Sequence, residues 1–101
     1  MIRGTTPTFQ LKLKDDSIDL TAAENVYATF KQGSKIVTKT GEDIVVNPHR
    51  VDVYFSQEET LKFRTGRLEI QLNWTYNDGS RACTKIVSKS VNRNLIERVL
   101  Q

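Results

Sequence analysis

The chain has 101 residues, of which 38% are hydrophobic and 27% charged, and its formal net charge is +3. These values fit one small folded domain covering residues 1–101 and exclude wholesale disorder. No stretch of about 18 apolar residues occurs, so we expect no membrane-spanning helix. The opening residues have no apolar central region, so we also expect no secretory signal.

Cysteine and histidine are too scarce for the commoner disulfide and metal sites. Cys83 is the single cysteine and His49 the single histidine. One cysteine cannot form an internal disulfide, and the two residues together cannot supply the three or four ligands of a zinc site. His49 lies in a polar connection next to Pro48, which favours a solvated turn over a catalytic base. Because no phosphate loop, nucleophile elbow or triad motif occurs, we expect a non-enzymatic protein without a cofactor.

The first predicted elements are a strand and a helical turn. Over residues 8–14 the odd positions are apolar and the even positions polar, which is typical of a half-buried strand in an antiparallel sheet. Residues 15–17 then turn the chain. Thr21 and Glu24 have the spacing of a capping box, so we predict one helical turn here, capped by Thr21.

Two hairpins are predicted next. Residues 26–31 and 35–39 flank Gly33, which can adopt the positive φ of a tight turn. Residues 44–46 and 51–55 flank an Asn-Pro-His-Arg turn, in which proline at the second position favours type I. In the last of these strands, valine and phenylalanine alternate with aspartate and tyrosine, so one face should be buried.

A second capping box spans residues 56–59. It predicts a helix of one or two turns, with Leu61 and Phe63 among the groups that could pack under the sheet. We expect Gly66 to end this helix.

The longest predicted strand covers residues 68–75 and is followed by a turn at residues 77–79. A three-residue loop with Gly79 as a bulge keeps apolar residues opposite one another, so we predict that register. It pairs Trp74 with Ala82, Leu72 with Thr84, Ile70 with Ile86, Gln71 with Lys85, and Arg67 with Lys89. It leaves Val87 on the outer face, which makes Val87 a candidate contact residue.

Short strands separated by glycine and proline turns indicate an all-β sandwich, with a small barrel as the alternative. The C-terminal segment, residues 92–101, differs because its apolar residues have helical spacing. They are Leu95, Ile96, Val99 and Leu100. This stripe is consistent with a short C-terminal helix, which either packs on the sheet or docks a partner. In the second case these four residues form the binding site.

Four segments resemble small proteins encoded in prophages of Gram-positive bacteria. They are Met1–Phe9, Asn25–Gly33, Ser56–Phe63 and Trp74–Gly79. The chain is also similar, more distantly, to the immunoglobulin-like N-terminal domain of phage upper baseplate proteins. The resemblance implies an immunoglobulin-like antiparallel β-sandwich and a genetic setting near phage tail and baseplate genes. The matching segments are strands and turns, and they offer no catalytic residues.

We therefore expect a structural or assembly component of a phage tail or baseplate that acts through protein–protein contacts. Its expected partners are phage structural proteins or further copies of itself, in the bacterial cytoplasm during phage assembly or in the virion. The alternative is a small basic nucleic-acid-associated accessory protein, suggested by the series Lys85, Lys89, Arg93 and Arg98. Because the basic residues are scattered among acidic ones along the chain, we favour the protein partner.

Overall fold

Strand β6 (Gly66–Thr75) is the centre of the larger of two sheets in the computed structural model, which describes residues 1–101. On one side β6 pairs with β2 (Asn25–Gln32), and β2 pairs in turn with β3 (Lys35–Thr40). On its other side β6 pairs with β7 (Arg81–Cys83) and, further along, with β8 (Val87–Val91). The result is a five-stranded antiparallel sheet.

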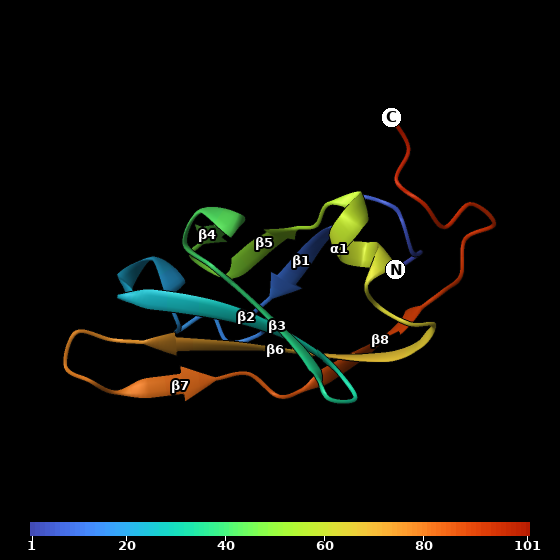
Figure 1. The fold of residues 1–101 in the computed structure, drawn as a ribbon. Coiled ribbons are helices and arrows are strands. Elements are labelled where there is room, and N and C mark those ends of the chain that lie inside the picture. The colour runs from blue at the N-terminus through green and yellow to red at the C-terminus, as the bar shows by residue number, and fades with distance from the viewer.

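The smaller sheet has the strand order β1–β5–β4. Its strands are β1 (Thr8–Lys12), β4 (Ile44–Asn47) and β5 (Arg50–Tyr54), and both pairings are antiparallel. In Figure 1 this sheet lies above the larger one, so the two make a β-sandwich. The predicted all-β sandwich and both predicted hairpins are confirmed. Gly33 has the expected positive φ, 59°, in the turn between β2 and β3.

Four phenylalanine rings join the two sheets. The Phe30 ring of β2 lies 4.8 Å from that of Phe55, which follows β5, and 5.3 Å from that of Phe9 in β1 (distances between ring centroids). Phe63, just after the helix, contacts Phe55 at 6.1 Å. Tilted and edge-on rings at these separations stabilise a core beyond the area that they bury.

The alternating face of β6 completes this core. Its buried residues are Leu68, Ile70, Leu72 and Trp74. Trp74 is therefore the core residue that the alternation predicts, and its Nε1 donates a hydrogen bond to the Tyr76 hydroxyl at 3.0 Å.

Three short helical elements connect the strands. The helix α1 (Gln57–Leu61) has the predicted capping box, in which Ser56 and Glu59 each accept a hydrogen bond from the other's backbone amide. It ends before Gly66, which instead begins β6 and has a φ of 130°. The 3₁₀ turns are η1 (Leu20–Ala22) and η2 (Gly41–Asp43).

The cap of η1 was predicted wrongly. Asp19, not Thr21, is the N-cap, and its carboxylate accepts a hydrogen bond from the Thr21 amide at 2.9 Å. Glu24 does not close a box, because its amide donates to the Thr75 carbonyl across the sheet. An aspartate two residues earlier is the stronger cap, and the sheet takes the backbone group that the box would need.

The predicted register is confirmed where β7 pairs with β6 and is wrong where β8 pairs with β6. Trp74 pairs with Ala82 as predicted, but Ile70 pairs with Val87 instead of Ile86, and Arg67 with Ser90 instead of Lys89. Two residues of β6 face three on the other strand here, so one extra residue forms a bulge between β7 and β8. Thr84 fixes its start, since its amide donates to the Leu72 carbonyl and its hydroxyl accepts from the Leu72 amide.

Candidate functional site

The C-terminal segment, residues 92–101, carries four exposed apolar side chains, one of which is the most exposed large apolar side chain of the molecule. Leu95 is 88% exposed, and Ile96, Val99 and Leu100 are each at least 38% exposed. In Figure 1 this segment leaves the end of β8 and projects past α1, away from both sheets. The four predicted contact residues of this segment are therefore accessible.

The predicted C-terminal helix does not form. Every residue of 92–101 lies outside helices, and only Asn92 takes part in a bridge, with Ile2. Side chains take the backbone donors that a helix would use. The Ile96 amide donates to the Asn94 side chain at 3.2 Å and the Leu100 amide to that of Gln57 at 2.7 Å. Ten residues cannot offset the cost of helix nucleation in water without packing, so these local contacts prevail.

Several polar contacts hold the segment beside the N-terminal residues and α1. Arg3 forms an ion pair with Glu97, and its guanidinium also donates to the carbonyls of Leu61 and Phe63. Gln57 of α1 exchanges two hydrogen bonds with the backbone of Leu100. The segment is thus anchored through polar groups, while Leu95 is almost uncovered and the other three apolar residues are partly exposed.

Val87 lies elsewhere, on the open side of the sandwich. Since it pairs with the core-facing residue Ile70, it belongs to the inner face of the sheet, whereas Ile86 lies beside outer-face residues such as Thr29. The outward placement predicted for Val87 is therefore wrong, and the bulge is the reason. Val87 is still 48% exposed, because it opens into a groove instead of a filled core.

This β1–β8 groove runs between the edge strand β1 and the strands β7 and β8. One wall consists of residues 10–15, and the other includes residues 83–85, Val87 and Lys89. The groove has two connected parts of about 230 and 380 Å³, which share Lys12, Thr84 and Val87. Lys85 and Lys89 of the predicted basic series lie here, while Arg93 and Arg98 belong to the C-terminal segment. Sequence patterns do not predict the groove, because it depends on the bulge.

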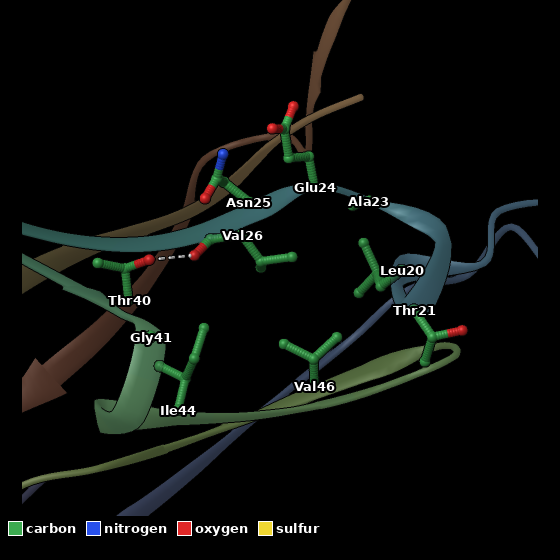
Figure 2. Close-up of a pocket in the computed structure, with 10 residues that line it drawn as sticks. All are labelled: Leu20, Thr21, Ala23, Glu24, Asn25, Val26, Thr40, Gly41, Ile44 and Val46. Atoms are coloured by element: carbon green, nitrogen blue, oxygen red, sulfur yellow. Dashed lines mark hydrogen bonds between the residues drawn. The ribbon is translucent and has the colours of Figure 1, made fainter. Parts of the chain in front are cut away.

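A second hollow, of about 390 Å³, lies near the start of β2 (Figure 2). Leu20, Ile44 and Val46 point into it, and Glu24 lies at its rim (Figure 2). The Thr40 hydroxyl on its wall donates to the Val26 carbonyl at 2.8 Å. Its polar groups do not converge on one point, so it offers no arrangement for catalysis.

The single histidine lies in a turn and the single cysteine at the end of β7. The His49 Nδ1 atom lies 2.8 Å from the Ile18 carbonyl, within the predicted turn, and Cys83 is an exposed thiol. No cluster of three histidine, cysteine or acidic side chains could hold a metal ion. Hydroxyl and amide hydrogen bonds from the serine or threonine two residues ahead lower the pKa of three turn carboxylates. These are Asp15, Asp19 and Asp78.

Comparison with known proteins does not extend this description. No family model, no curated protein and no solved structure matches the chain. None of its helices is long and apolar enough to span a membrane.

Proposed function

We propose that this protein is a non-enzymatic structural or assembly component of a phage tail or baseplate, and that it docks through its C-terminal segment. The main support for this docking site is that four apolar side chains are exposed on one extended stretch of the chain. They are Leu95, Ile96, Val99 and Leu100. An apolar group of this kind is typical of a surface that a partner covers. The phage setting and the immunoglobulin-like character of the sandwich rest on the resemblance of strand and turn segments.

The test is multi-angle light scattering of the purified chain at several concentrations, alone and mixed with the tail and baseplate proteins encoded beside it. We expect a mass above that of the monomer in at least one of these samples. The variant Leu95→Glu with Leu100→Glu should remove this association, because buried carboxylates without partners are costly. A strict monomer that forms no complex with any of these proteins would contradict the proposal.

A matched control separates the C-terminal segment from general surface hydrophobicity. Ile36 and Ile86 are 59% and 57% exposed and lie outside the segment. The variant Ile36→Glu with Ile86→Glu makes the same change in net charge and should leave the association unchanged. Loss of association in this control as well would mean that the segment is not the docking site.

A further inference from the structure

The open side of the sandwich presents an unpaired strand edge. β1 pairs only with β5, so its other edge borders the β1–β8 groove. The Leu13 amide donates to the His49 carbonyl, and the Phe55 amide to the Pro7 carbonyl. The backbone N–H and C=O groups of the odd-numbered residues of β1 therefore point at β5. In an antiparallel ladder this leaves the N–H and C=O groups of the even-numbered residues, Gln10 and Lys12, directed at the groove.

The lining of the β1–β8 groove combines an apolar floor with a basic rim. Leu11, Leu13 and Val87 contribute apolar surface, and four lysines surround it. The lysines are Lys12, Lys14, Lys85 and Lys89. Asp15 is the one acidic residue of the lining, and its carboxylate is occupied by the Ser17 amide and hydroxyl. The local field is therefore strongly positive.

This charge decides what the groove can accept. Lysines on an edge strand keep two copies of the same edge apart, so a second β1 is repelled. The C-terminal segment of a neighbouring copy is also a poor match, since it carries Arg93 and Arg98 against a single Glu97. The complementary occupant is acidic.

We propose that the β1–β8 groove binds an extended acidic segment of a partner protein, which adds as a further strand to the free edge of β1. In such a strand, side chains alternate between the inner and outer faces of the sheet. Residues on the inner face would cover Leu11, Leu13 and Val87 and should be apolar. Residues on the outer face would lie opposite Lys12 and Lys14 and should be aspartate or glutamate. At about 3.3 Å per residue, the wall formed by residues 10–15 accommodates about six residues of the segment.

This second docking surface does not depend on the one in the C-terminal segment. The probe is a fluorescein-labelled decapeptide that alternates valine with glutamate, titrated into the full chain and followed by fluorescence anisotropy. A peptide with five valines followed by five glutamates has the same composition and charge but no alternation. We expect the alternating peptide alone to bind, and the amides of Gln10 and Lys12 to shift in ¹⁵N spectra and become protected from hydrogen exchange.

Three variants locate the site. Lys12→Glu with Lys14→Glu should weaken binding about tenfold or more, which corresponds to losing about 1.4 kcal/mol. Lys31→Glu with Lys62→Glu changes the net charge equally at exposed positions outside the groove lining and should have no effect. Gln10→Pro keeps every charge but removes a backbone donor of the free edge, which an edge strand tolerates, and it should also abolish binding.

Several results would overturn the proposal. They are equal binding of the two peptides, shifts confined to residues outside the groove, or no binding of the alternating peptide below about 1 mM. Tighter binding of a single-stranded oligonucleotide at the same lysines would make the surface a nucleic-acid site instead. The variant Leu95→Glu with Leu100→Glu should keep its affinity for the peptide, so that failure of the groove and failure of the C-terminal docking site are distinguishable.

Discussion

The ammonium group of Lys39 lies 4.7 Å from the centre of the Phe55 ring and forms an ion pair with Glu59. Lys39 is only 6% exposed, although it belongs to the edge strand β3. Glu59 also accepts a hydrogen bond from the Ser56 amide at 2.9 Å. One carboxylate thus neutralises the buried lysine and closes the capping box of α1, and the contact joins β3 to the helix.

Replacing Lys39 should therefore be costly. We expect Lys39→Ala to lower the free energy of unfolding by about 2 kcal/mol, because it removes the cation–π contact and leaves Glu59 without its partner. Urea unfolding followed by tryptophan fluorescence measures the change. Lys31→Ala, at an exposed position of β2, is the control and should stay within about 0.5 kcal/mol of the wild type. Equal effects of the two substitutions would contradict this role of Lys39.

The same pair makes stability depend on pH. Desolvation raises the pKa of Glu59, but hydrogen bonds from Lys39 and Ser56 outweigh it, so the pKa is lower in the folded chain than the ordinary value. A carboxyl group with a lowered folded pKa stabilises the fold above its unfolded pKa, about 4.3 for glutamate. This contribution is lost as the pH falls through the lower, folded pKa.

Urea midpoints measured between pH 7 and pH 3 test this expectation. We expect the midpoint to fall below about pH 4.5 in the wild type, and to fall less steeply in Glu59→Gln, which has no carboxyl group to titrate. An identical slope in the two proteins would show that other carboxylates, such as Asp15 and Asp78, account for the acid sensitivity.

A buried hydroxyl joins α1 to the N-terminal residues. Thr60 is fully buried, and its Oγ1 accepts from the Gly4 amide at 3.0 Å and donates to the Thr5 carbonyl at 2.8 Å. Thr60→Val preserves the shape but leaves both backbone groups without a partner, which should cost about 1–3 kcal/mol. Thr60→Ser keeps the hydroxyl and serves as the control in thermal unfolding. The prediction is wrong if the serine variant is the less stable of the two.

The bulge leads to an unusual expectation for deletions. Lys85 and Ile86 together face Gln71, so deleting Lys85 should merge β7 and β8 into one regular strand and keep Val87 opposite Ile70. We expect stability to change by no more than about 1 kcal/mol. Nuclear Overhauser contacts between Ile70 and Val87 should persist.

Deleting Ser88 is the matched control. It lies within the regular part of β8, so its loss shifts the register and moves the buried Val91 out of place. This deletion should cost about 2–3 kcal/mol, in the range for losing a buried aliphatic side chain. A Lys85 deletion as damaging as that of Ser88 would argue against the bulge.

Much of the fold follows from local patterns, and the exceptions have physical causes. The alternation in β6 and the box from Ser56 to Glu59 predict these elements, because each depends on neighbouring residues only. The register of β8 does not follow, because a single extra residue exchanges the faces of Ile86 and Val87. Helical spacing in the C-terminal segment predicts a helix that lacks a surface to pack on.

Of the two candidate sites, one can also be predicted from local sequence patterns and the other cannot. The apolar residues of the C-terminal segment can be found from sequence, since their spacing is visible. The β1–β8 groove cannot, because Lys12 and Lys85 are far apart along the chain and meet only through the packing of the two sheets. The alternating lysines of residues 8–14 are the one local signal, and they look like an ordinary solvated face.

The pairing of β2 with β6 has a consequence for how the chain reaches its native state. It joins residues 25–31 to residues 69–75, and three strands and α1 lie between them in sequence. The hairpins around Gly33 and Pro48 can form early, because each joins strands that are neighbours in sequence. β2 and β6 can pair only after the long loop between them has closed. Topologies dominated by such distant contacts fold in milliseconds to seconds. Until then the valine and phenylalanine faces of both hairpins remain in water, so refolding yield should fall as the protein concentration rises.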